Sequence, residues 1–193
     1  DQYIDFAVDG ARRMKQLIQD LLAYSRVSTQ GRVFTPVNMN NLLESVCSNL
    51  AITIHETQAT IDYDSNLPTI QGDETQLISL FQNLIGNAIK FHKPDQKPII
   101  NIAAQKVEEN WQFTVKDNGI GISPKFHDRI FTIFKRLHTS SEYSGTGIGL
   151  AICKKIVERH NGTIWVESNI DTGSIFYIKI PAEGKAQDIE LTP

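Results

Sequence analysis

The spacing of apolar residues predicts one long amphipathic helix over residues 3–27. Apolar residues recur there at alternating intervals of three and four, which is the pattern of a heptad seam: Ile4, Ala7, Ala11, Met14, Ile18 and Leu21. Val8, Leu17 and Leu22 widen this stripe. A single helix cannot cover so wide an apolar face. The helix therefore either packs on its own domain or, as we favour, belongs to a helical bundle whose other helices lie elsewhere.

After the polar stretch 28–32, which resembles a linker, the pattern becomes mixed. Alternation of apolar and polar residues predicts strands at 33–37, 60–63, 69–71, 99–106, 111–116, 163–168 and 175–180. Helical spacing predicts helices over 40–58, 73–91 and 150–160, and a short one that starts at Ser123-Pro124. Asp73 is the predicted N-cap of the second helix, in a capping box with Gln76. Because hairpins and helices are segregated, we expect an α+β fold: a two-layer α/β sandwich with helices on one face of a mixed sheet.

Composition narrows the class of protein further. The chain has 193 residues, 40% of them hydrophobic, which suffices for one core and a small appendage. A net charge of −3 gives no reason to expect nucleic acid as a partner. No apolar run approaches the roughly 20 residues that a membrane span needs. Cys47 and Cys153 fall in amphipathic helices without disulfide spacing, which is typical of reduced core residues in a cytoplasmic protein.

Alternate glycines in Gly145-Thr146-Gly147-Ile148-Gly149-Leu150 lead directly into the last predicted helix. Glycines let backbone N–H groups approach a ligand, and a helix N-terminus attracts an anion, so this segment predicts a phosphate-binding loop. Two common nucleotide motifs are excluded. The preceding stretch 138–144 is polar rather than a strand, and no third glycine falls at the dinucleotide spacing. The Gly-Lys-Ser/Thr of a Walker loop is also missing after Gly145.

A second polar feature lies on the helix predicted from Asp73. Asn83, Asn87 and Lys90 are spaced i, i+4 and i+7, so they share one helix face. An asparagine oxygen can bind Mg²⁺, and a lysine can neutralise phosphate charge. The alternative interpretation is that these three polar residues only face solvent and bind nothing.

Two further motifs follow. The segment 117–122, Asp-Asn-Gly-Ile-Gly-Ile, comes directly after an apolar strand. A buried Asp117 would need a donor such as the exocyclic amine of adenine, although Asp-Asn-Gly is also ordinary turn sequence. In Phe131–Arg136 the phenylalanines can serve packing alone, whereas Arg136 can reach a terminal phosphate. Glycines at both ends of 119–145 are typical of a lid.

In order and spacing, these motifs resemble the four boxes of the catalytic ATP-binding domain of sensor histidine kinases. Residues 83–91 resemble the N box, 117–122 the G1 box, 131–136 the F box and 144–150 the G2 box. The wider family includes gyrase-type, Hsp90-type and MutL-type ATPases. Residues 1–27 resemble the second helix of the dimerisation and phosphotransfer bundle of the same kinases. The N box and the segment after the F box are similar to those of phytochrome-like and PAS-coupled kinases.

The resemblance implies roles at the phosphate side of the site. Asn87 matches the Mg²⁺-binding asparagine, Lys90 a phosphate-contacting lysine, and Phe91 an aromatic residue lining the nucleotide pocket. Asn83 matches a base-like or orienting catalytic residue, although an amide cannot take up a proton at neutral pH. Arg136 matches the catalytic F-box arginine near the γ-phosphate.

The resemblance also implies contacts around the base. Asp117 matches the adenine-recognising aspartate, with Gly119 and Gly121 giving the base access to the backbone. Ser174 occupies the small hydroxyl position that helps to hold adenine through water. Further nucleotide contacts are implied for Phe134 and, in the lid hinge and phosphate loop, for Gly145, Thr146, Gly147, Gly149 and Leu150.

The phosphoacceptor of the resembled family matches none of the five histidines of this chain. The family motif is His followed by Glu or Asp and soon by Pro-Leu, on the first bundle helix. His55-Glu56 and His127-Asp128 match only the first two positions, and His92, His138 and His160 lack an acidic neighbour. We therefore expect all five to be surface or structural residues. The chain should bind ATP without completing autophosphorylation by itself.

The resemblance thus implies a bundle helix at 1–27, a linker at 28–32, a catalytic ATP-binding domain at 33–181 and a C-terminal tail at 182–193. The expected activity is that of a protein-histidine kinase, with ATP and Mg²⁺ as cofactors. It transfers the γ-phosphoryl to a bundle histidine outside this chain, for relay to a response-regulator receiver domain. A homodimer through the bundle helix and a cytoplasmic location are implied, with membrane anchoring of the parent left open. The alternative is a non-catalytic nucleotide-binding or dimerisation module, a degenerate kinase.

Overall fold

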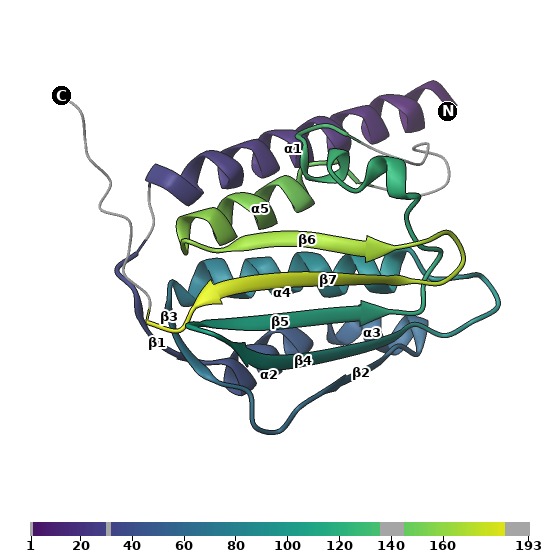
Figure 1. The fold of residues 1–193 in the computed structure, drawn as a ribbon. Coiled ribbons are helices and arrows are strands. Elements are labelled where there is room, and N and C mark those ends of the chain that lie inside the picture. The colour runs from purple at the N-terminus through teal and green to yellow at the C-terminus, as the bar shows by residue number, and fades with distance from the viewer. Residues whose placement is uncertain (1, 30–31, 136–144, 184–193) are drawn as a thin grey trace.

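A long helix lies beside an α+β sandwich in the computed structural model, which describes residues 2–29, 32–135 and 145–183 (Figure 1). The helix α1, Gln2–Thr29, extends past the predicted end at residue 27. It packs against helix α5, Gly149–Arg159. Leu17, Tyr24 and the buried Val27 contact the core of the sandwich. Most of the predicted seam stays exposed: Ile4, Val8, Met14, Ile18, Leu21 and Leu22. Helix α1 therefore packs on its own domain through one face and leaves the seam uncovered.

A mixed five-stranded sheet of order β2-β4-β5-β7-β6 forms one layer of the sandwich. The strands are β2 Thr60–Tyr63, β4 Ile99–Val107, β5 Asn110–Asp117, β6 Thr163–Ser168 and β7 Ser174–Pro181. Strand β2 runs parallel to β4, and the other neighbours are antiparallel. The remaining strands, β1 Thr35–Asn38 and β3 Thr69–Gly72, form a separate antiparallel pair. The α+β prediction is confirmed, with strands close to the predicted positions.

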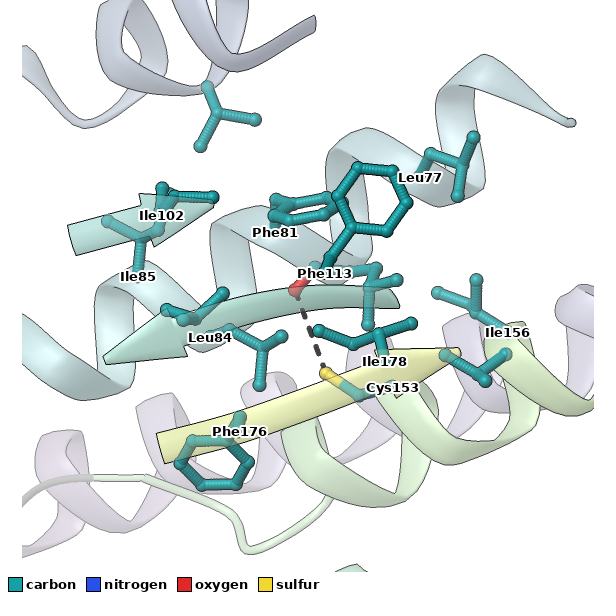
Figure 2. Close-up of a cluster of buried hydrophobic side chains, with 14 of the residues drawn as sticks. Leu77, Phe81, Leu84, Ile85, Ile102, Phe113, Cys153, Ile156, Phe176 and Ile178 are labelled. Carbon is teal, nitrogen blue, oxygen red and sulfur yellow. Dashed lines mark hydrogen bonds between the residues drawn. The ribbon is translucent and has the colours of Figure 1, made fainter. Parts of the chain in front are cut away.

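Helices α2 (Met39–Asn49) and α4 (Glu74–Lys90) lie behind the sheet in Figure 1, and α5 lies between the edge strand β6 and α1. Figure 2 shows the core between them, where Phe81 of α4 lies edge-on to Phe113 of β5, with ring centroids 5.8 Å apart. Large side chains of this kind each contribute about 1.5–3 kcal/mol when they are fully buried. On the opposite face of the sheet, Trp165 stacks on Tyr177 at 5.0 Å with an interplanar angle of 4°.

The helix predicted over 40–58 is two helices, and the prediction of a single one was wrong. Helix α2 ends and α3, Ala51–Thr57, begins at Leu50, whose φ of −97° and ψ of 5° are not helical. Leu50 and Ile54 both pack against the core, so the apolar spacing continues across the break. No glycine or proline marks the position. The short helix predicted from Ser123-Pro124 is a 3₁₀ turn, Pro124–Phe126, and a second turn follows at Arg129–Phe131.

Helices α4 and α5 run antiparallel. The start of each helix therefore lies beside the end of the other. In the middle, the Cys153 thiol of α5 donates to the Leu80 carbonyl of α4, 3.7 Å away. Asp73 and Arg159 define one end, which we call the linker end. Lys90 and Gly149 define the other, which we call the glycine end. None of the described helices is long and apolar enough to cross a membrane.

Buried polar residues at the linker end hold the chain that leaves α1. Asp73 caps α4, as predicted, by accepting from the Gln76 N–H at 3.3 Å. The Gln76 side chain does not complete the predicted capping box; it donates instead to the carbonyl of Val27 at 3.0 Å. Asp73 also accepts from the Arg32 N–H at 2.7 Å and pairs with Arg159 at 3.3 Å.

His160 completes this end. Its Nε2 accepts from the Asp73 N–H at 3.1 Å, so Nδ1 carries the proton and donates to the Ile156 carbonyl at 2.8 Å. Phe34 stacks on the ring with centroids 4.4 Å apart. Burial is the main cause that lowers the pKa of His160 below its usual value. His160 is therefore structural, as predicted.

Candidate nucleotide site

The predicted polar face of α4 meets the glycine loop at the glycine end. The Asn83 side chain donates to the Ser79 carbonyl at 2.8 Å, which fixes its amide. A Cβ added to Gly149 would lie 2.6 Å from Oδ1 of Asn83. Real side chains do not approach so closely, so a larger residue where α5 begins would force the Asn83 side chain to shift. Two motifs more than sixty residues apart in the sequence are thus in contact.

Lys90 and Phe91 stand where α4 ends. The ammonium group of Lys90 lies 4.6 Å from the centroid of the Phe91 ring, and it would lie 2.8 Å from a Cβ on Gly145. Phe134 donates its backbone N–H to the Gly147 carbonyl at 3.1 Å, which joins the F-box segment to the loop. The Phe134 side chain is 58% exposed. Arg136, the predicted catalytic arginine, lies outside the described residues.

Asn87 is half-buried on the same face of α4, between Asn83 and Lys90. Its side chain makes no hydrogen bond within the part of the chain that the structure describes, unlike that of Asn83. The described residues also hold no group of three or more His, Cys, Asp or Glu side chains suited to a metal ion. A cation at this end would therefore depend on Asn87 and on oxygens of a ligand, which is a donor set that suits Mg²⁺.

Thr146 has a contact that the sequence did not predict. Its hydroxyl donates to Oδ2 of Asp20 on α1. Helix α1 therefore touches both ends of the α4–α5 pair, through Asp20 at the glycine end and through Val27 at the linker end. The neighbouring Leu150, the second residue of α5, is half-buried and packs against the core.

Asp117 ends β5 with its carboxylate largely buried. Its Oδ1 accepts from the backbone N–H groups of Gly119 at 2.8 Å and Ser174 at 3.1 Å. Oδ2 accepts no hydrogen bond from any residue within the described ranges. Burial raises the pKa of the Asp117 carboxyl, and the Gly119 and Ser174 N–H groups lower it by less. The carboxylate is thus held by one oxygen and offers the other.

Two glycines bring the surrounding loops close to Asp117. Gly121 has a φ of +73°, and a Cβ there would lie 1.9 Å from the Asn169 carbonyl. Gly173 has a φ of +79°, and a Cβ there would lie 2.0 Å from the Asp117 carbonyl. Larger residues fit neither the conformation nor the space. On the other side, Ile120 donates its N–H to the Phe91 carbonyl at 3.0 Å, so this loop also contacts the end of α4.

Ser168 and Lys93 belong to this arrangement and were missed in the sequence. The Ser168 hydroxyl bonds to Ile122, Gly173 and Ser174. Lys93 donates to the Asp171 carbonyl at 2.7 Å and ties the β6–β7 turn to the chain after α4. One signal for Ser168 existed, since it alternates with Val166 on the inward side of its strand, where a polar residue needs a partner. No motif marked Lys93.

This end of the molecule suits a nucleotide chemically. The free oxygen of Asp117 can accept from an amino group, and Gly119 beside it lies against the backbone of Phe91 at the end of α4. The N-terminus of α5 and the ammonium group of Lys90 favour anions beside the glycine loop. An acceptor for a base and a positive region for phosphates thus occur at one end.

Comparison with known proteins agrees with this chemistry. Residues 72–184 match the family described as histidine kinase-, DNA gyrase B-, and HSP90-like ATPase. The chain therefore belongs to this family. Its relatives are phytochromes and sensor histidine kinases: cyanobacterial phytochrome A of Nostoc sp. is 51% identical over 97% of this chain and 24% of its own length. The chain spans about a quarter of the length of the phytochrome relatives that it matches.

Solved structures show the same fold. Full-length ShkA in complex with AMPPNP aligns with a TM-score of 0.74 and 26% identity, over 96% of this chain and 39% of that chain. Histidine kinase ThkA in complex with response regulator protein TrrA aligns with a TM-score of 0.71 and 26% identity, over 94% of this chain and 51% of that chain. The sandwich is therefore the ATP-binding catalytic domain of the histidine kinase type.

Proposed function

We propose that this chain is the catalytic part of a two-component sensor histidine kinase. The observation that supports the proposal most is the meeting of four sequence motifs at the glycine end, through Asn83 with Gly149, Phe91 with Ile120, and Phe134 with Gly147. No single motif predicts this arrangement, because each has an ordinary structural explanation when taken alone. A site for ATP explains all four together.

The adenine is recognised by Asp117. Its free Oδ2 accepts from the exocyclic amine, while Oδ1 stays fixed by the Gly119 and Ser174 N–H groups. Gly119 lets the loop pack closely beside Asp117, because a Cβ there would lie 2.5 Å from the Phe91 carbonyl. Phe91 lines the same side. Ser174 assists through its hydroxyl and a bridging water.

The phosphates lie along the start of α5 and the end of α4. Asn87 would hold Mg²⁺, which when bound neutralises phosphate charge. Lys90, the loop from Gly145 to Gly149 and the N-terminus of α5 add positive potential and N–H donors. Asn83, held by Ser79, orients groups at the terminal phosphate rather than acting as a base. Arg136 adds charge near that phosphate.

The γ-phosphoryl acceptor is a histidine on a bundle helix outside this chain, reached by in-line transfer. This agrees with the environment of the chain's own histidines, such as His160, which is buried at the linker end. The exposed seam of α1 pairs with a second copy to form the homodimeric bundle. The phosphoryl group then passes to the receiver domain of a response regulator, the class of partner present in the ThkA complex.

ATP binding is tested with Asp117→Asn. We expect a loss of about 1–3 kcal/mol in ATP binding free energy, because the amide cannot replace the carboxylate as an acceptor with the same strength. Isothermal titration would measure it, with Asp62→Asn on the exposed edge strand β2 as matched control. An unchanged ATP affinity would contradict the adenine assignment.

Asn87→Ala should abolish the Mg²⁺ dependence of nucleotide binding, and full retention of that dependence would contradict the assignment of Asn87 as a Mg²⁺ ligand.

Phosphoryl transfer is tested by mixing the chain with labelled ATP and a separately produced helix pair that carries the family's phosphoacceptor motif. Label should appear on the histidine of the helix pair and disappear with Asn87→Ala. ATP binding without any label on that histidine would favour a non-catalytic nucleotide-binding module instead.

A further inference from the structure

Ser168 ends β6 with its hydroxyl buried between the two backbone segments that surround Asp117. The residue is 8% exposed. Its Oγ accepts from the Ile122 N–H at 2.7 Å, donates to the Gly173 carbonyl at 2.7 Å, and lies 3.0 Å from Oγ of Ser174. One hydroxyl therefore joins the loop after β5 to the turn before β7.

Counting donors fixes the direction of the bond between the two serines. A serine hydroxyl has one proton and two lone pairs. The Gly173 carbonyl cannot donate, so the Ser168 proton is used there. The Ile122 N–H cannot accept, so it occupies one lone pair of Ser168. The remaining lone pair of Ser168 must receive the proton of Ser174.

Ser174 is left as an acceptor by this arrangement. Its single proton points to Ser168, so both of its lone pairs face elsewhere. Its backbone N–H is already donated to Oδ1 of Asp117. The two side-chain atoms that the proposed function assigns to the base, Oδ2 of Asp117 and Oγ of Ser174, therefore offer acceptors and no donor. Such acceptors bind a ligand whose N–H groups face them. They disfavour a ligand that places a carbonyl oxygen at the same point, because two acceptors cannot form a hydrogen bond.

We propose that Ser168 is a specificity-determining positioning residue: it orients the Ser174 hydroxyl as an acceptor and so makes the site favour adenine over 6-oxo purines. The inference rests on the proposed ATP function, and it concerns a residue that need not touch the nucleotide. Ser168 acts through Ser174 and through the loops that hold the Asp117 carboxylate.

The test uses the ratio of two dissociation constants, for ATP and for inosine triphosphate, which carries oxygen in place of the exocyclic amine. In Ser168→Ala the Ser174 proton is released and can be donated toward that oxygen, through the bridging water of the proposed site, so the preference for ATP should fall at least tenfold. Ser168→Thr keeps the hydroxyl and should keep most of the preference. Thr163→Ala, at the exposed start of β6, is the matched control and should change neither constant.

A merely structural role would give a different result. Loss of the bonds to Ile122 and Gly173 alone would weaken both nucleotides equally and leave their ratio unchanged, which would overturn the proposal. If Ser168→Ala does not fold, Ser174→Ala removes the oriented hydroxyl and leaves the Ser168 bonds to the backbone in place. An unchanged ratio in that variant would also overturn it.

The same data separate this inference from the proposed function. Wild-type protein that binds neither nucleotide contradicts the ATP function itself. Wild-type protein that binds both equally contradicts the acceptor-only site. A wild-type preference that survives in Ser168→Ala contradicts the role of Ser168 and leaves the ATP function standing.

Discussion

The two ends of the α4–α5 pair carry polar residues of opposite kinds. At the linker end, Asp73, Gln76 and Arg159 bond to one another and to the backbone groups of Val27 and Arg32. At the glycine end, the Asn87 side chain and one oxygen of Asp117 have no hydrogen-bond partner among the residues that the structure describes. No fully buried side-chain nitrogen or oxygen of the described residues lacks a partner, so these two groups are accessible from outside. The chain thus completes one end by itself and leaves the other to be completed by a ligand.

This difference separates residues that hold the fold from residues that serve binding. Changes at the linker end should reduce stability and leave intrinsic nucleotide recognition intact. Removal of the Asn87 side chain at the glycine end should do the reverse, because that side chain makes no hydrogen bond within the described part of the chain.

The largest expected effect is that of Asp73→Ala. Its side chain is 2% exposed and pairs with Arg159, whose side chain is 12% exposed. Removing one partner leaves a largely buried cation uncompensated, so the free energy of unfolding should fall by about 3–5 kcal/mol. Urea unfolding measures this. Glu74→Ala, at the neighbouring exposed position, should change it by less than about 1 kcal/mol. Equal losses of unfolding free energy in the two variants would show that the buried pair of Asp73 and Arg159 does not stabilise the fold.

A second effect is that acid should act on the two ends in opposite directions. Burial lowers the pKa of His160, so the unfolded chain takes up its proton first as the pH falls below about 6.5. Stability present at neutral pH is then lost. Burial raises the pKa of Asp117, so here the folded state takes up its proton first and acid adds stability. Each group changes the slope of the unfolding free energy against pH by at most about 1.4 kcal/mol per pH unit.

Two variants separate these contributions in unfolding experiments between neutral and mildly acidic pH. His160→Gln removes the titrating ring, so its stability should fall less with acid than that of the wild type. Asp117→Asn removes the opposing carboxyl, so its stability should fall more. Identical pH profiles for all three proteins would show that neither group is coupled to folding.

The smallest expected effect concerns two glycines of the helix pair. A Cβ on Gly86 of α4 would meet nothing within 4 Å, so Gly86→Ala should raise the free energy of unfolding by about 0.5–1 kcal/mol through helix propensity. The same change at Gly149 should give no gain, because its Cβ would collide with Asn83. A matching gain at both positions would show that the contact between α4 and the glycine loop tolerates a side chain.

Much of this organisation could be predicted from local sequence, and the exceptions share a physical cause. The strands, the cap at Asp73 and the motifs of the site follow from spacing and composition. The break at Leu50 could not be predicted, since apolar spacing continues across it. Gln76 was expected to close its own capping box, but it bonds to Val27, which lies far away in the sequence. Local patterns show that a polar group needs a partner and do not show which partner the fold supplies.

The contacts of Asp20 with Thr146 and of Ser168 with Ile122 belong to the same class. Each joins segments that lie next to each other only after the sheet and helices have assembled. Asp20 and Ser168 stand in no motif, and the inward position of Ser168 on its strand shows only that it needs a partner. Sequence analysis therefore recovers the residues that face the ligand better than the residues that hold them in place.

The stacked Trp165 and Tyr177 give the sheet an optical property. Two rings held nearly parallel at 5.0 Å interact as coupled chromophores, which produces a near-ultraviolet circular dichroism band and efficient energy transfer from tyrosine to tryptophan. The strand that carries Trp165 ends at Ser168, beside the proposed adenine position. The protein thus contains an intrinsic spectroscopic reporter, close to its candidate binding site, that needs no attached dye.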